Sequence, residues 1–244
     1  MKAIGGTEIL SATEVENLTR DVLTRAGAAS APAGSVARAI RHAEERGHRR
    51  LGLGLVPHMV EHLRCGRVDG QARPVVSVVA PGAMAADAAG GFACPAIEQA
   101  LPDLQRRARR LGAAVLTLQN AYPLVSLGPL QAHLSAEGFA VVASGQGVVS
   151  RPGPGGALVL DLAPVAHGLP DTPDLPKALV PDRWPASLPD LPFEGPLGGP
   201  FRLRHHIVVL HADSWPMPAR PAMPLPEDSG IAVPVALLER VINA

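Results

Sequence analysis

Helical patterns alternate with short segments rich in β-branched residues through the middle of this 244-residue chain, and this alternation restricts its fold more than any other feature. Val75–Val79 reads as a strand that ends at a Pro81-Gly82 turn. The elements expected after it are a helix over Ala96–Leu111, strands over Ala113–Leu118 and Phe139–Ser144 with a helix over Leu127–Glu137 between them, and a strand over Gly156–Leu162. Strands interleaved with helices are typical of an α/β layered core, which we place at residues 71–165.

The first seventy residues have a helical pattern instead. Ser11 and Glu14 have the spacing of a capping box at a helix start, in which each side chain accepts a hydrogen bond from the other residue's backbone amide. The expected helices are Ser11–Gly27, Gly34–Glu45 and His58–Arg64, the last with Pro57 in its first turn. The sequence therefore predicts an N-terminal helical cap over residues 1–70.

The last third of the chain, residues 166–244, is expected to differ again. Prolines between Pro152 and Pro200 recur too densely for a helix or a central strand. A strand over His205–Leu210 and a closing helix over Val233–Val241 follow. We expect a Pro-rich arm, a return strand and a C-terminal helix that packs back on the core.

Composition excludes several classes of function. Lys and Arg together number 22, as do Asp and Glu, and only 3% of residues are aromatic. A neutral chain lacks the basic face that nucleic acid requires, and the pattern holds no apolar segment that could span a membrane. Cys65 and Cys94 are too few for a disulfide framework, which indicates a cytoplasmic protein, and we expect no metal site.

The segment AEERGHRRLGLGLVPHMVEHLRCGRV, Ala43–Val68, resembles the pattern A-D-x-R-G-x-x-S-H-G-x-x-R-x-P-x-Y-x-x-x-L-x-x-G-R of the type-2 malate/L-lactate dehydrogenases. Further pieces of the resemblance follow in order: LGAAVLTLQN, AEGFAVV, VLDLAP, HHIVVLHAD and SGIAVPVALLERV. It implies a non-Rossmann α/β fold with a mixed sheet, shortened here. It also implies a homodimer that reduces 2-oxo acids or cyclic imino acids with NADH or NADPH.

Four positions depart from the family pattern. Leu51 stands at its His, Leu55 at its Arg and Met59 at its Tyr, and Pro123 stands at the His of its second fingerprint, N-S-N-H. Reduction of a ketone needs a proton donor near the oxygen and a cation to orient the carboxylate, and leucine supplies neither. We therefore expect that the redox chemistry is lost and that no nicotinamide cofactor is bound.

The residues nearest to the missing groups are the candidates for binding and catalysis. His48, Arg49 and Arg50 precede Leu51 in the same turn, where His48 could exchange a proton and the two arginines could bind a substrate carboxylate. A solvated loop between helices is the alternative.

Other candidates lie elsewhere in the chain. Tyr122, the single tyrosine, and His58 are candidate catalytic groups, and Asn120 and Asp161 are candidate substrate-binding groups. His58, Glu61 and His62 also match the zinc-protease pattern H-x-x-E-H, but we interpret the two histidines as surface or interface residues.

Three hypotheses remain for the function. The preferred one is a repurposed, cofactor-independent enzyme that cyclises, isomerises or eliminates a small carboxylate or imine intermediate. The second is an NAD(P)-dependent oxidoreductase acting on a 2-oxo acid or cyclic imino acid. The third is a non-catalytic partner subunit of a full-length relative. For the enzyme we expect a small-molecule substrate, no nucleic-acid or membrane partner, and a homodimer; a heteromer with a longer relative is the alternative.

Overall fold

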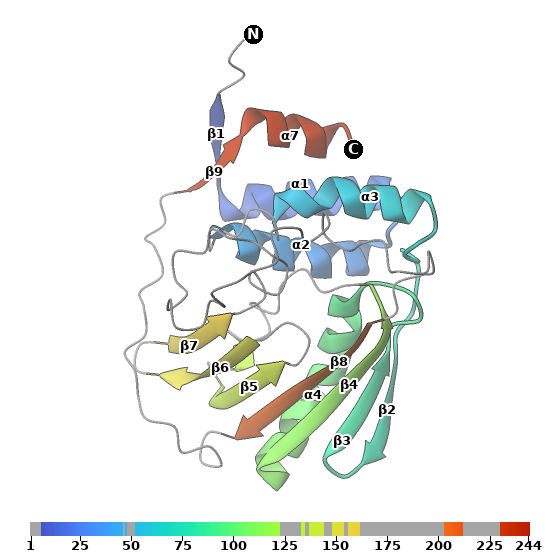
Figure 1. The fold of residues 1–244 in the computed structure, drawn as a ribbon, viewed down its shortest axis with the longest axis vertical. Coiled ribbons are helices and arrows are strands. Elements are labelled where there is room, and N and C mark those ends of the chain that lie inside the picture. Colours follow the sequence, from blue (N-terminus) through green and yellow to red (C-terminus); the bar gives the residue numbers. More distant parts are fainter. Residues whose placement is uncertain are drawn as a thin grey trace, which may run out of the picture.

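The computed structural model has a helical layer above a curved β-sheet (Figure 1). The residues that the structure describes are 6–45, 47, 52–122, 133–134, 137–143, 148–153, 156–161, 203–211 and 230–244. In this part of the chain no helix is both long and apolar enough to cross a lipid bilayer.

The helical layer contains α1 (Ala12–Arg25), α2 (Ser30–Glu45) and α3 (Val56–Arg64), as the pattern of the first seventy residues predicts. The 3₁₀ turn η1 (Leu53–Leu55) leads into α3. Helix α2 begins four residues before the predicted start at Gly34, because Pro32 is accepted in a first helical turn.

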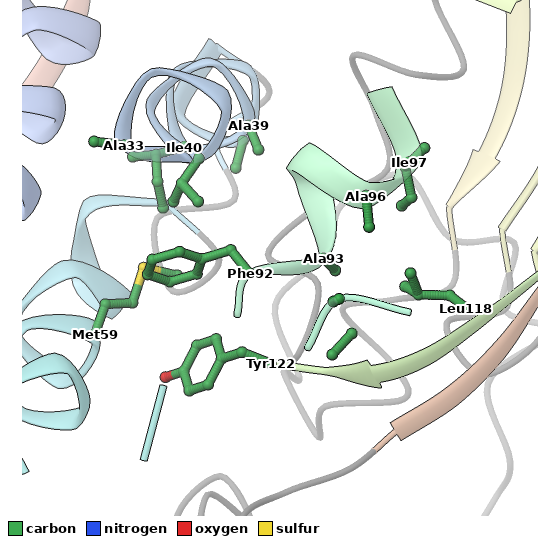
Figure 2. Packing of buried hydrophobic residues seen from close by; sticks show 14 of the residues in the cluster. Ala33, Ala39, Ile40, Met59, Phe92, Ala93, Ala96, Ile97, Leu118 and Tyr122 are labelled. Carbon is green, nitrogen blue, oxygen red and sulfur yellow. The ribbon is translucent and has the colours of Figure 1, made fainter. Parts of the chain in front are cut away.

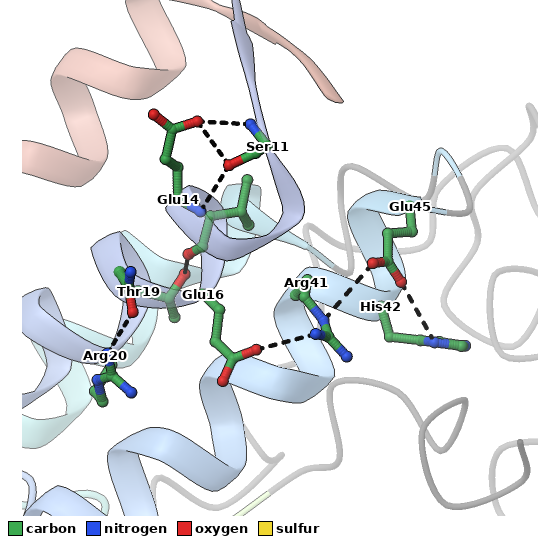
Figure 3. A network of polar contacts seen from close by, with 10 residues as sticks. Ser11, Glu14, Glu16, Thr19, Arg20, Arg41, His42 and Glu45 are labelled. Carbon is green, nitrogen blue, oxygen red and sulfur yellow. Dashed lines mark hydrogen bonds and ion pairs between the residues drawn. The ribbon is translucent and has the colours of Figure 1, made fainter. Parts of the chain in front are cut away.

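The capping box at the start of α1 is confirmed. The Ser11 hydroxyl accepts from the Glu14 amide, and the Glu14 carboxylate accepts from the Ser11 amide at 2.7 Å (Figure 3). Arg41 of α2 forms an ion pair with Glu16 of α1, which joins the two helices, and a second one with Glu45 within α2 (Figure 3).

Replacing Ser11 with Ala should lower the free energy of unfolding by about 1 kcal/mol, because the first turn of α1 loses a hydrogen-bond acceptor. Chemical denaturation measures this, and Ser11→Asp, which keeps an acceptor, is the control. Equal losses in the two variants would contradict a capping role.

Within the described residues, the main sheet has seven strands in the order β2-β3-β4-β8-β5-β6-β7. Strands β3 and β4 pair in parallel, and the other named pairs are antiparallel, so the predicted mixed sheet is confirmed. The strands are β2 (Val75–Ala80), β3 (Ala83–Asp87), β4 (Ala113–Ala121), β5 (Phe139–Ala143), β6 (Val148–Gly153), β7 (Gly156–Asp161) and β8 (Leu203–His211).

Helix α4 (Ala93–Leu111) packs on β4 and ends at Gly112, whose φ of 83° suits glycine. It begins three residues before the predicted start at Ala96. At the other end of the chain, the closing helix predicted to start at Val233 starts two residues later, as α7 (Val235–Ile242), because Val233 and Pro234 end a strand, β9 (Ile231–Pro234). Strand β9 pairs with β1 (Thr7–Leu10) to form a separate two-stranded sheet beside the helical layer.

Buried apolar side chains join the helical layer to the sheet. Met59 of α3 and Ile40 of α2 lie close to Phe92, which precedes α4, and Tyr122 at the end of β4 lies beside them (Figure 2). One hydrophobic cluster therefore includes residues from both layers. The division at residues 70 and 165 stays a prediction, and most of the Pro-rich arm and of the expected helix Leu127–Glu137 lies outside the described residues.

Candidate functional site

The backbone segments that follow β3 and end β4 run side by side. The Ala88 amide donates to the Gln119 carbonyl at 2.9 Å, and the Gly90 amide donates to the Asn120 carbonyl at 2.8 Å. Past the ends of the strands, Phe92 and Tyr122 form an isolated parallel bridge. Tyr122 therefore lies one residue beyond the end of β4, where its side chain contacts His62 in the last turn of α3.

Unusual backbone conformations are concentrated at this corner. Ala89 and Asn120 have φ values of 53° and 49°, a left-handed region that side chains rarely adopt. The Asp87 carboxylate stabilises both: Oδ1 accepts from the Ala89 amide and Oδ2 accepts from Asn120 Nδ2, each at 2.7 Å. Strained backbone held in this way is more frequent at functional sites.

Tyr122 and His62 form a buried hydrogen-bonded pair at this corner. The phenolic oxygen of Tyr122 lies 2.8 Å from Nδ1 of His62, and the two side chains are in edge contact with a ring-centroid distance of 5.6 Å. Phe92 packs edge-on against the other side of Tyr122. Only 7% of His62 and 5% of Tyr122 remain exposed, so this polar pair is shielded from bulk water.

Burial keeps both groups neutral. It raises the pKa of the Tyr122 phenol, against a smaller opposing effect of the Arg67 charge. It also lowers the pKa of His62 below the ordinary value of 6.5, and Arg67 and His58 lower it further while Glu61 opposes them. A neutral phenol therefore faces a neutral imidazole near pH 7, and one of the two groups donates the hydrogen bond that joins them.

The lowered pKa of His62 predicts that the protein loses stability in mild acid. The unfolded chain binds a proton at His62 near pH 6.5 and the folded chain only at lower pH, so the stabilising difference is fully present above pH 6.5. It decreases as the pH falls below that value. The denaturation midpoint of the wild type should fall between pH 7.5 and pH 5. The midpoint of His62→Gln should fall by a smaller amount over the same range. His133→Gln, a change at an exposed histidine, is the control and should leave the decrease intact.

The face of α3 that carries His62 is otherwise apolar. Leu55, the last residue of η1, precedes Met59 and His62 of α3 at helical spacing, and both apolar residues are buried in the core cluster. Leu55 and Met59 occupy the positions where the resemblance implies Arg and Tyr. The polar group of this face thus lies one turn farther along the helix, at His62.

The candidates His48, Arg49 and Arg50 follow α2 in the sequence. All three lie outside the described residues. Among the described residues on either side of them, buried Glu44 accepts a hydrogen bond from the Leu53 amide at 2.6 Å, and a Cβ added at Gly52 would meet the Glu44 side chain. Glu44, near the end of α2, therefore holds the start of η1 at Leu53.

Two of the remaining candidates are near neighbours in the sequence at one strand end. Asn120 and Tyr122 both lie at the end of β4, although the Asn120 amide donates to Asp87. His58 is exposed on α3. Asp161 ends β7, which three strands separate from β4, and its side chain lies outside the described ones.

His62 is the residue that the sequence interpretation missed. Of the two interpretations given to it, surface or interface residue, the surface one is wrong, because His62 lies on the buried face of α3. The spacing of Leu55, Met59 and His62 was the signal that could have placed it there. Within the described residues, no group of three potential metal ligands occurs.

Comparison with known proteins agrees with this fold. The family model for malate/L-lactate dehydrogenases matches residues 10–179. Among solved structures, a Δ¹-piperideine-2-carboxylate reductase from Pseudomonas syringae has a TM-score of 0.70 at 17% identity, over 97% of this chain and 99% of that one. A malate dehydrogenase from Pyrococcus horikoshii has a TM-score of 0.69 at 14% identity, over 96% and 93%. The chain belongs to the malate/L-lactate dehydrogenase family.

Relatives with higher sequence identity are reductases by name. A Δ¹-pyrroline-2-carboxylate/Δ¹-piperideine-2-carboxylate reductase from Pseudomonas putida is 38% identical over 52% of this chain and 37% of its own length. A Δ¹-pyrroline-2-carboxylate reductase from Ancylobacter novellus is 32% identical over 66% and 48%. The chain thus spans less than half the length of these curated relatives.

These relatives correct two expectations from the sequence. The preferred interpretation, a repurposed cofactor-independent enzyme, is wrong, because the relatives support the alternative of an oxidoreductase. The expected absence of a cofactor is wrong for the same reason, since a reduction needs a source of two electrons.

Proposed function

We propose that this chain carries an NAD(P)-dependent reductase activity toward a cyclic imino acid of the Δ¹-pyrroline-2-carboxylate type. The observation that carries the proposal is the 38% identity to a reductase of this name over half of the chain. The reaction adds a hydride to the imine carbon and a proton to the nitrogen, which yields a cyclic amino acid.

The chemistry of the imine suits the residues of this chain. An imine nitrogen is more basic than a ketone oxygen, so it accepts a proton from a weaker donor. A buried neutral phenol beside a neutral imidazole is a donor set of this kind, and its shielding from water fits hydride chemistry. When bound, a reduced nicotinamide cofactor would supply the hydride. Arg49 and Arg50 remain the candidates for binding the substrate carboxylate.

Cofactor binding tests the proposal first. Isothermal titration and the thermal midpoint should both respond to NADH or NADPH, because a ligand stabilises the state that it binds. ATP is a matched control that carries an adenine nucleotide without nicotinamide. Binding of either dinucleotide followed by its imine-dependent oxidation supports the proposal. No response at millimolar dinucleotide contradicts it.

We also propose that the protein is a cytoplasmic homodimer. Both cysteines are free thiols, which supports a reducing compartment. Val75, Val78 and Val79 on the outer strand β2 are between 53% and 69% exposed, which supports association of chains. Sedimentation equilibrium should give twice the chain mass; a monomer, or purification only with a longer relative, would contradict the homodimer.

A further inference from the structure

We propose that the outer edge of strand β2 is the dimer interface of this protein. In this interface the segment Val75–Val79 pairs antiparallel with the same segment of a second copy, and the two main sheets become one continuous sheet. The inference rests on the proposed homodimer, to which it adds the surface, the register and the symmetry. It does not depend on the reductase activity.

Strand β2 forms one edge of the main sheet and is open to solvent. Among the described strands it pairs with β3 alone, so its other side presents backbone N–H and C=O groups to a further strand (Figure 1). Five of its six residues are exposed, with Val75 at 63%, Val78 at 53% and Val79 at 69%. A long apolar edge of this kind is a template for pairing with another chain.

The sequence of β2 is symmetric about Ser77, since VVSVV reads the same in both directions. Antiparallel pairing reverses the second strand, so with Ser77 of the two copies face to face, Val76 lies opposite Val78 of the other chain. Val75 likewise lies opposite Val79. Every valine then meets a valine and the two hydroxyl groups meet each other, which are favourable cross-strand pairs. A shift by one residue would place the Ser77 hydroxyl opposite a valine. This symmetry favours a second copy of the chain over an unrelated strand.

The charges near β2 are compatible with this register. Val75–Ala80 contains no charged residue, and Arg73, the nearest charge before it, falls opposite Pro81 of the other chain. Arg107, which donates to the Pro81 carbonyl, has its charge paired with Asp103 at 3.0 Å. The paired segment therefore brings no like charges directly opposite each other, an arrangement that would be unfavourable.

The ends of β2 limit the pairing to this short segment. Pro74 and Pro81 flank the strand, and proline has no backbone N–H to donate. The irregular register with β3 lies between Val78 and Ala80, at one end, and leaves the centre at Ser77 regular. Because a two-fold pair uses the outer edge of both copies, association stops at two chains.

Disulfide cross-linking tests the register, in a Cys65→Ser background that removes the exposed native thiol. Opposite residues of an antiparallel pair have Cα atoms about 4.5–5.5 Å apart, a separation that a disulfide spans. Ser77→Cys should therefore give a covalent dimer on mild oxidation, whereas the background variant should not. Val75→Cys should not cross-link with itself, because the two copies of this position lie about 13 Å apart along the strands. It should cross-link after subunit exchange with Val79→Cys.

A charge at the centre of the segment tests the same surface without covalent chemistry. Ser77 is exposed in the single chain, so lysine is compatible with the fold, but in the pair two ammonium groups would face each other. Sedimentation equilibrium of Ser77→Lys should give the mass of one chain, with an unchanged circular dichroism spectrum. Ile9→Lys, a matched change at a 72% exposed residue of β1, should remain a dimer.

The outcomes separate the interface from the homodimer and from the reductase. A dimeric wild type whose Ser77→Cys variant does not cross-link, or whose Ser77→Lys variant stays dimeric, would overturn the interface and leave the homodimer in place. Cross-linking of Val75→Cys with itself as fast as Ser77→Cys would overturn the register. A monomeric wild type would overturn the homodimer and the interface together. Dinucleotide oxidation is measured independently of all these readouts.

Discussion

Replacement of Leu55 with Arg, the residue that the family resemblance implies there, is expected to lower the free energy of unfolding by about 3–5 kcal/mol. Leu55 is only 5% exposed and belongs to the cluster that joins α3 to the rest of the core. A guanidinium at this position would be buried among apolar side chains, and a buried charge without a partner is costly. Chemical denaturation of the purified variant measures the loss.

The matched control at this position is Leu55→Met, which conserves volume and should cost less than about 1.5 kcal/mol. A Leu55→Arg variant that is as stable as the wild type would contradict the burial of this position. If it also bound the imino acid more tightly, position 55 would face a substrate site rather than the core.

Removal of the Phe92 ring is expected to have an effect of similar size. Phe92 is 3% exposed, packs edge-on against Tyr122 and directly precedes α4. Phe92→Ala should lower the free energy of unfolding by about 3–5 kcal/mol, because it leaves a cavity between the helical layer and the sheet.

Two measurements on Phe92→Ala distinguish local packing from a general loss of stability. Burial raises the pKa of Tyr122, so opening the cavity should bring the phenolate titration closer to that of an exposed tyrosine. Phe92→Leu, which refills part of the space, should show smaller changes in both properties. A Phe92→Ala variant with an unchanged titration would contradict the contact between the two rings.

The helical layer could be predicted from the sequence because its signals are local. The capping box at Ser11 and the apolar period of α1 depend only on neighbouring residues. Strand β3 was missed for the opposite reason. Its sequence, AMAAD, has no β-branched residue, and it is a strand because β2 and β4 pair with it on both sides. Strand β4 was predicted to end at Leu118, whereas it continues to Ala121 past an irregularity in its pairing with β8.

The candidate site shows the same limit. Tyr122 was selected from the sequence because it lies in a recognisable segment. Its partner could not be identified, since His62 is 60 residues away in the chain and only the fold places the two side chains together. The strained corner at Ala89 and Asn120 likewise depends on the Asp87 carboxylate, a contact between two different strands.

The most direct test of the proposed reductase activity is the transfer of the hydride itself. Purified protein is incubated with Δ¹-pyrroline-2-carboxylate and NADH or NADPH that carries deuterium as its transferable hydride. The product is then analysed by mass spectrometry. We expect a cyclic amino acid with one deuterium on the carbon that bears the carboxylate, formed in proportion to the dinucleotide oxidised. Absence of labelled product with both dinucleotides, from folded protein, would contradict the assignment of this chain as a reductase.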